Sequence, residues 1–180
     1  MEFKEIFIHC SDSDYGSALL IDQWHRARGW TGGIGYHFVV SNGRTTDGMK
    51  NPWNIMNGSI EAGRRLDDDD KFEADEVGAQ VYGLNSTSIG ICMIGKKSFS
   101  ESQFLKLRFL VGELQSKLKI PAASVYGHYE AGIVDPKYAT TKTCPNFNVS
   151  DFRLFVADKI TMSDMMSRTK IHIAGLNLAP

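Results

Sequence analysis

Short apolar runs bounded by turn-forming residues predict the strands of this 180-residue chain. Residues 3–9 (FKEIFIH) form a β-branched and aromatic run that ends in a polar cluster, and residues 35–40 (GYHFVV) form a second such run. Residues 87–94 (TSIGICMI) are apolar throughout, which is typical of a strand in the middle of a sheet. Residues 124–126 predict a further short strand, and residues 59–62 predict another inside a stretch that is otherwise mostly loop.

Apolar residues that recur every three or four positions predict the helices. Ser17 can cap a helix that runs to about residue 28. Residues 100–103 (SESQ) are a capping box, and residues 104–118 repeat apolar positions at helical spacing behind it. Residues 150–160 predict a last amphipathic helix, whereas residues 161–180 show no clear period. The buried stripe of the first helix is expected to comprise Leu20, Ile21 and Trp24.

The turn signals and the order of elements predict the architecture. The Asn-Gly pair in residues 41–44 (SNGR) predicts a type I′ hairpin turn with a third strand after it. Gly90 predicts that another segment approaches the central strand closely. The mixture of strands and helices indicates a single α/β domain with a central mixed β-sheet flanked by helices. We assign residues 1–160 to this domain and residues 161–180 to a C-terminal tail without an assigned role.

Composition and charge limit the classes of function. The chain is 42% hydrophobic and 23% charged, which is typical of a globular domain rather than of a disordered or coiled-coil protein. Its 20 Lys and Arg residues balance 21 Asp and Glu residues, so the net charge of -1 creates no field that would hold a nucleic acid. Apolar runs are too short for a membrane helix, and charges near the start argue against a signal peptide. We therefore expect a monomer that is made in the cytoplasm and binds neither nucleic acid nor membranes.

Three residues with metal-binding side chains, His9, His128 and Cys144, lie where an ordered element gives way to a polar loop. Two neutral imidazoles and one thiolate are ligands that Zn²⁺ accepts, and three protein ligands leave one tetrahedral position for water, as in catalytic sites. A zinc site in a cleft at the strand ends is therefore one interpretation of these three residues. The alternative is that each residue is an ordinary packed or surface group, which the burial habits of lone histidines and cysteines favour.

Six short segments occur in an order that resembles a known family. The chain is similar to the type 2 N-acetylmuramoyl-L-alanine amidases, which share their fold with the peptidoglycan recognition proteins, and within them to the amidase-type lysozymes of T-odd coliphages. The likeness extends from residue 3 to about residue 157. The segments are IHCS (8–11), GYHF (35–38), IEAGR (60–64), Asn85 with SIGI (88–91), GHYE (127–130) and KTCPNF (142–147).

The resemblance implies a reaction and the residues that carry it. By position, His9, His128 and Cys144 look like the ligands of one catalytic Zn²⁺, and Tyr36 and Lys142 look like two groups that assist catalysis. The implied reaction is hydrolysis of the amide bond between N-acetylmuramic acid and L-alanine in peptidoglycan. The residues expected to bind substrate are Arg64, Gln80 and Asn85.

Three departures from the family pattern change this picture. Cys92 stands where related bacterial members carry a glutamate that acts as a general base. The phage branch also lacks this glutamate, so Tyr36 and Lys142 are expected to take a larger share of the catalysis. Gln80 stands where the family often has a histidine that faces the substrate; it can form hydrogen bonds but carries no charge. The interval 135–141 is longer than in the coliphage enzymes, which bears on the placement of Lys142.

The resemblance also implies a biological setting, a phage or prophage endolysin that is made in the host cytoplasm and released to the cell wall by a separate pore. A cytoplasmic recycling amidase is the competing setting. Two other classes of function stay open. One is a non-catalytic peptidoglycan-binding module on the same fold, and the other is a cysteine peptidase that pairs Cys10 or Cys144 with His128.

The other reactive residues are expected to be structural. Tyr36 and His37 are adjacent on a predicted strand and face opposite sides, so we assign Tyr36 to the cleft and His37 to packing with a backbone partner. His25 is expected on the surface of its helix, and Cys10 is expected as a buried apolar thiol.

The acidic residues 67–70 and the single residue Arg64 each have both a structural and a functional interpretation. Residues 67–70 (DDDD) lack the alternation of a calcium-binding loop and are interpreted as a solvated acidic tip. Arg64 can pair with a carboxylate of the substrate peptide or form a structural ion pair.

Overall fold

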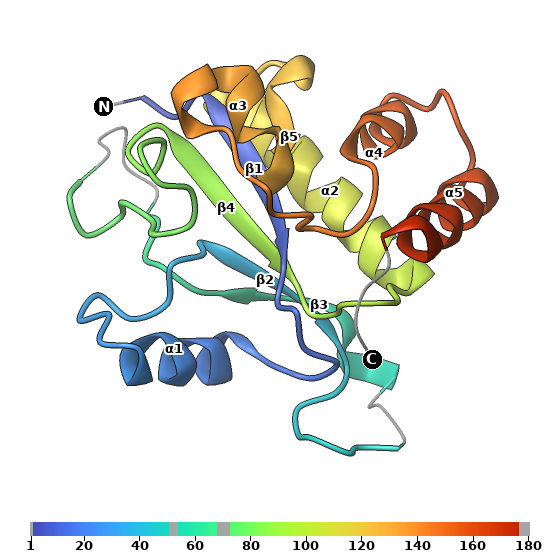
Figure 1. Ribbon diagram of the computed structural model, residues 1–180, viewed down its shortest axis with the longest axis horizontal. Helices are drawn as coiled ribbons and strands as arrows, with labels where there is room; N and C mark the ends of the chain where they lie inside the picture. Colours follow the sequence, from blue (N-terminus) through green and yellow to red (C-terminus); the bar gives the residue numbers. More distant parts are fainter. Residues whose placement is uncertain (1, 51–53, 68–72, 177–180) are drawn as a thin grey trace.

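A five-stranded sheet forms the centre of the molecule (Figure 1). The computed structural model describes residues 2–50, 54–67 and 73–176. The strands are β1 Glu5–Cys10, β2 Phe38–Asn42, β3 Asn57–Ala62, β4 Ser88–Met93 and β5 Val125–Gly127. Their spatial order is β3-β2-β4-β1-β5, and every neighbouring pair is parallel except β2 and β3. The single α/β domain with a mixed sheet is thereby confirmed, with β4 in the middle as its apolar sequence predicts.

The described ranges contain five α-helices, which pack on the sheet or on one another, and most begin at a side-chain cap that the sequence encodes locally. They are α1 Ala18–Ala27, α2 Glu101–Leu118, α3 Ala131–Val134, α4 Val149–Val156 and α5 Met162–Gly175. Short 3₁₀ segments occur at η1 Asn54–Met56, η2 Ala122–Ser124, η3 His128–Glu130 and η4 Pro136–Tyr138. Ser17 accepts a hydrogen bond from the Leu20 amide, and Ser100 and Gln103 form a reciprocal capping box. The two predicted helix starts are therefore confirmed.

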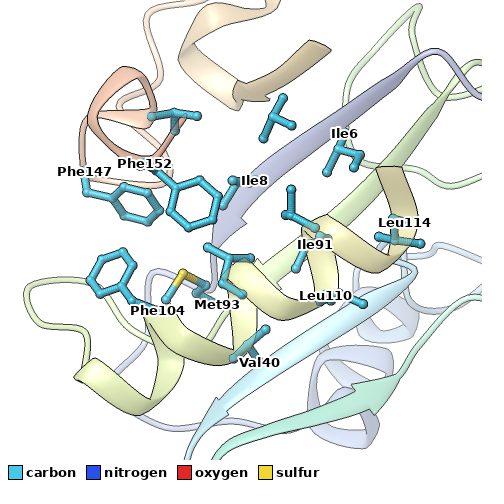
Figure 2. Close-up of a cluster of buried hydrophobic side chains, with 14 of the residues drawn as sticks. Ile6, Ile8, Val40, Ile91, Met93, Phe104, Leu110, Leu114, Phe147 and Phe152 are labelled. Atoms are coloured by element: carbon cyan, nitrogen blue, oxygen red, sulfur yellow. The ribbon is translucent and has the colours of Figure 1, made fainter. Parts of the chain in front are cut away.

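The alternation of side chains along the strands separates two faces of the sheet. On β1, Ile6 and Ile8 point toward α2 and α4, whereas Phe7 and His9 lie on the opposite face. Figure 2 shows the larger cluster, in which side chains of the sheet meet Phe104 from α2, Phe147 from the loop before α4 and Phe152 from α4. The opposite face packs on α1 and α3. His9 lies on this face, near the carboxyl end of β1.

The connection after β2 differs from the predicted hairpin. Asn42 does not adopt the positive φ that a type I′ turn requires, although Gly43 does, with φ 79°. The side chain of Asn42 instead accepts a hydrogen bond from the Arg44 amide and donates one to the Asp14 carbonyl. The partner strand β3 begins only at residue 57, so the prediction of a tight turn followed directly by a strand was wrong.

The segment after residue 160, where the sequence shows no clear period, contains helix α5. Thr161 and Asp164 form a capping box, and α5 packs on α4. Only Met165 and Thr169 are buried on this helix, which explains the weak periodic signal. Of the acidic tip, Asp67 is described and pairs with Arg65, whereas residues 68–70 lie outside the described residues.

His37 is held as a neutral imidazole inside the fold, just ahead of β2. Its Nδ1 accepts a hydrogen bond from the Gly90 amide at 2.9 Å, and its Nε2 donates to the Glu76 carbonyl at 2.8 Å. The packing role with backbone partners is therefore confirmed. Burial is the main reason that the pKa of His37 falls from 6.5 to about 4.

This pKa predicts a loss of stability in mild acid. Between pH 6.5 and about 4, His37 is protonated in the unfolded chain but stays neutral in the folded protein. Because the unfolded state binds more protons there, the free energy of unfolding falls as the pH falls through this window. The slope for one such group is about 1.4 kcal/mol per pH unit. Urea unfolding at pH 7, 6 and 5 should show a shallower slope for His37→Gln. The matched variant His172→Gln, on the half-exposed side of α5, should keep most of the slope; equal slopes in all three proteins would contradict the assignment.

Candidate metal centre

Two parallel strands bring His9 and His128 to the same edge of the sheet. His9 is the fifth residue of β1, and His128 directly follows β5. The strands pair in parallel with Ile8 opposite Gly127, so their carboxyl ends meet (Figure 1). The two imidazole rings lie 4.8 Å apart between centroids and are nearly perpendicular.

Cys144 reaches the same point from the loop that precedes α4. The Tyr129 amide donates a hydrogen bond to the Cys144 carbonyl at 3.2 Å, which ties this loop to the residue after His128. The Cys10 amide points at the Cys144 sulfur at 3.0 Å, and Cys144 Sγ lies 3.7 Å from His9 Nδ1. One ligand atom from each of His9, His128 and Cys144 lies within 4.8 Å of the other two.

The protonation states of this cluster suit a cation. Burial, followed by the proximity of His128, lowers the pKa of His9 to about 3, and burial followed by Lys142 lowers the pKa of His128 to about 4. Both imidazoles are therefore neutral near pH 7 and have a free lone pair. Contact with the Cys10 side chain and burial raise the pKa of the Cys144 thiol, so this sulfur needs a cation beside it to become a thiolate.

One of the spacings in the cluster already matches Zn²⁺. Tetrahedral zinc with bonds of about 2.0–2.3 Å places its ligand atoms roughly 3.3–3.7 Å apart. The 3.7 Å between His9 Nδ1 and Cys144 Sγ already matches this separation. The widest spacing in the cluster, up to 4.8 Å, has to close by roughly 1 Å, which side-chain rotation can supply. The residues present can therefore hold the ion that the sequence predicts.

Gln80 holds His9 in the orientation that this cluster needs. His9 Nε2 donates to Gln80 Oε1 at 2.6 Å, which leaves Nδ1 directed at Cys144. The Gln80 amide in turn donates to the Ser88 hydroxyl at 2.7 Å, and Ser88 donates to the Leu84 carbonyl at 2.6 Å. Each donor in this series of hydrogen bonds has an acceptor, so the tautomer of His9 is determined by its partners.

The sequence carries one trace of this contact. Gly90 predicts a close approach to the central strand, and a Cβ on Gly90 would lie 2.7 Å from Gln80 Cγ. Gly90 thus makes room for the side chain that orients His9. The substrate-binding role expected for Gln80 stays a prediction, and the hydrogen bond to His9 is a contact that the sequence analysis missed.

Replacing Gln80 should weaken metal binding. In Gln80→Met the Nε2 of His9 loses its acceptor, and we expect roughly 10- to 100-fold weaker zinc affinity, as when comparable partners of metal-binding histidines are removed. Competition against a chromophoric chelator measures this affinity. Gln115→Met on α2, which exchanges a glutamine remote from the cluster, serves as the matched control. Unchanged affinity in Gln80→Met would show that His9 is oriented without it.

The residues expected to act on the substrate are placed in two groups. Lys142 and Asn85 line a cavity of about 450 Å³ together with His128. The Tyr36 ring lies beside His9, with 5.0 Å between centroids, and burial raises the pKa of Tyr36 well above 10, so its phenol stays protonated. Arg64 lies against Gly32 rather than among the residues that line this cavity, and its role in substrate binding stays a prediction.

His25 is buried, and the expectation that it lies on the surface was wrong. Its side chain is 6% exposed, and its Nδ1 accepts a hydrogen bond from the Gly35 amide at 3.1 Å. The ring also packs against Trp30 and Tyr36. The buried stripe of α1 is Ala18, Ile21 and His25 rather than the predicted Leu20, Ile21 and Trp24.

An ion pair that the sequence analysis missed supports the strand end that carries His128. Arg153 on α4 donates to both carboxylate oxygens of buried Glu130, each at 3.0 Å, and to the Val125 carbonyl at 2.7 Å. Glu130 also accepts from the Gly127 amide at 2.9 Å. Residues on both sides of His128 are thereby anchored to α4.

The fold and the cluster together define a class, an α/β domain with a candidate His-His-Cys metal centre at the carboxyl ends of its parallel strands. The family model described as N-acetylmuramoyl-L-alanine amidase matches residues 1–147. The chain belongs to this family and is an enzyme of the amidase class.

Individual relatives agree with this membership. The chain is 30% identical over 175 residues to an endolysin of Klebsiella phage KP32. The aligned region covers 91% of this chain and 92% of the relative. It is 28% identical over 170 residues to an endolysin of Escherichia phage T7, covering 88% and 89%.

Solved structures support the fold alone, because their sequence identities are low. N-acetylmuramoyl-L-alanine amidase LysC from Clostridium intestinale URNW superposes with a TM-score of 0.63 at 23% identity over 87% of each chain. Drosophila PGRP-LB gives a TM-score of 0.54 at 21% identity over 80% of this chain and 75% of that chain. In the part of the chain that the structure describes, no helix is both long and apolar enough to cross a membrane.

Proposed function

We propose that this protein is a zinc-dependent endolysin that hydrolyses the amide bond between N-acetylmuramic acid and L-alanine in peptidoglycan. The observation that carries the proposal is the convergence of His9, His128 and Cys144 within 4.8 Å in a member of the amidase family. The relatives named endolysin support action on the bacterial cell wall. Synthesis in the host cytoplasm and passage to the wall through a separate pore belong to the same proposal.

The three ligand residues would bind one Zn²⁺ with two neutral imidazoles and one thiolate. The ion supplies Lewis-acid chemistry, since it lowers the pKa of a coordinated water and polarises a carbonyl oxygen. The Cys10 amide that points at the Cys144 sulfur stabilises the thiolate form by hydrogen bonding. Gln80 keeps His9 in the tautomer that leaves Nδ1 for the ion.

Lys142 and Tyr36 would assist the reaction from two sides. Lys142 lines the cavity next to His128, so its ammonium can stabilise the negative charge that develops on the amide oxygen. Tyr36 remains protonated because it is buried, so it acts as a hydrogen-bond donor rather than as a base. Asn85 lines the same cavity, but its Oδ1 already accepts from the amides of Gln80 and Val81.

The other two classes of function have less support. A peptidoglycan-binding module without activity has no need of three convergent ligands and a lysine beside them. A cysteine peptidase that uses Cys144 needs a thiolate nucleophile without a metal, whereas contact with the Cys10 side chain and burial raise the pKa of the Cys144 thiol. Cys10 itself is buried in the apolar cluster of Ile6 and Ile8, on the face of β1 opposite His9. Both features favour the metal-dependent amidase.

One experiment tests the bond and the ion on the same sample. Purified sacculi digested with the protein should release peptides with new L-alanine amino termini and no new reducing sugar ends, as mass spectrometry would detect. Metal analysis should find one zinc per chain, and 1,10-phenanthroline should abolish lysis until zinc is restored. New reducing ends would contradict the assigned bond, and lysis that resists the chelator would contradict the metal.

A further inference from the structure

One wall of the cavity beside His128 is built by residues outside the candidate metal centre. The wall comes from η4 and from the turn that carries Tyr82. Among the residues that line the cavity, the charged ones are two lysines, and no carboxylate is present. The lining residues that matter here are Tyr82, Lys137, Tyr138 and Lys142.

The aromatic part of this wall is held in place by close packing. The Tyr138 ring lies directly on the backbone of Gly83, where a Cβ would come within 2.0 Å of the ring. Gly83 also has φ +80°, a conformation that favours glycine. Tyr82 meets Tyr138 edge-on, with 6.1 Å between centroids, although Tyr82 is 88% exposed. Close packing on Gly83 thus fixes the position of Tyr138, and the exposed ring of Tyr82 extends this aromatic surface along the cavity.

The cationic part of the wall keeps capacity for a ligand. Lys137 Nζ lies 4.7 Å from the centroid of Tyr138 and 2.9 Å from Asp135 Oδ2. This exposed ion pair stabilises the protein little. The ammonium group interacts with the side chains of both Asp135 and Tyr138, which leaves one of its three N–H donors for a ligand. Among the described residues, no carboxylate forms an ion pair with Lys142. Two ammonium groups thus face one cavity that contains no internal counter-charge in its lining.

We propose that this wall is a specificity site for a free carboxylate on the peptide of the substrate, an inference that rests on the proposed function. In a muramoyl-peptide the lactyl carboxyl is consumed in the scissile amide, and the sugars otherwise carry hydroxyl and acetamido groups. Free carboxylates therefore occur on the peptide side. Lys137 binds the carboxylate, and the rings of Tyr82 and Tyr138 pack against the aliphatic part of the same peptide.

Lys137 contributes to recognition and not to the chemical step. It is not one of the candidate ligands, and a contact made equally in the ground state and the transition state changes KM without changing kcat. The expected effect of losing one partly exposed charge pair is about fivefold.

The test uses two synthetic muramoyl-peptides that differ only in one peptide side group, a free carboxylate or the corresponding carboxamide. The full-length zinc-loaded protein should bind the acidic peptide about fivefold more tightly in calorimetry, and should cleave it with a correspondingly lower KM. Lys137→Met should lose this preference with kcat unchanged. Lys97→Met, which removes an exposed lysine outside the cavity lining, should retain it.

The outcomes separate this inference from the proposed function. Equal affinity of the unmodified protein for the two peptides, or a full preference in Lys137→Met, would overturn the carboxylate site. Failure to cleave either peptide would instead overturn the assigned reaction, and the affinity ratio would still decide whether Lys137 recognises the carboxylate.

Discussion

Cys144→Ser should lose both its bound zinc and its amidase activity. A neutral hydroxyl cannot replace the thiolate as a ligand, and the two imidazoles that remain are too few to hold the ion. We expect activity to fall by more than about 100-fold, beyond the range seen when partners outside the ligand set are removed. Metal analysis after gel filtration and turnover on a soluble muramoyl-peptide measure the two effects.

The controls for this variant separate ligand loss from misfolding. Serine preserves the size of the side chain and can accept the same hydrogen bond from the Cys10 amide, so the fold should persist in circular dichroism. Cys92→Ala removes a different buried thiol, from β4, and should retain zinc. An active, zinc-replete Cys144→Ser protein would show that Cys144 is not a ligand.

Lys142→Met should retain zinc and turn over much more slowly. The lysine lines the cavity next to His128, and its expected role is to stabilise charge on the amide oxygen as the bond is attacked. We expect kcat to fall about 100-fold, with the zinc content unchanged. Steady-state kinetics on the metal-replete protein provides the measurement.

Two further variants make this result specific. Lys97→Met should behave like the unmodified protein, because that lysine lies outside the cavity lining. Lys142→Arg keeps the positive charge and should recover part of the lost rate. A normal kcat in Lys142→Met would mean that the long 135–141 interval shifts the catalytic lysine away from this position.

The candidate ligands were predictable because their sequence signals are local. His9 and His128 each end a short apolar run, and strands of that type place their carboxyl ends together in a parallel sheet. The capping boxes and the central strand follow from interactions between residues a few positions apart. Cys144 also stands where an ordered element gives way to a polar loop, and its role as the third ligand, like that of the two histidines, was implied by the resemblance to a family.

Other features required the folded chain. The burial of His25 depends on which side of α1 meets the sheet. The apolar pattern of this helix is compatible with a buried side that includes Trp24 and with a neighbouring one that includes His25, and only the folded structure selects the second. Helix α5 buries only two residues, so its period is weak before α4 is present as a packing partner. Asn42 keeps a negative φ while its side chain donates to the Asp14 carbonyl, and this long-range contact overrides the local preference for a tight turn.

By itself, the sequence of this protein determined the alternating strands, the capped helices and the polar residues that end them, because these depend on neighbours along the chain. The tertiary structure decided which partners those residues meet. Gln80 contacts His9 across 71 positions, and Cys144 reaches His9 across 135. Contacts of that range form only when the sheet and its helices close together, since their free energy must offset the entropy lost in ordering the intervening chain.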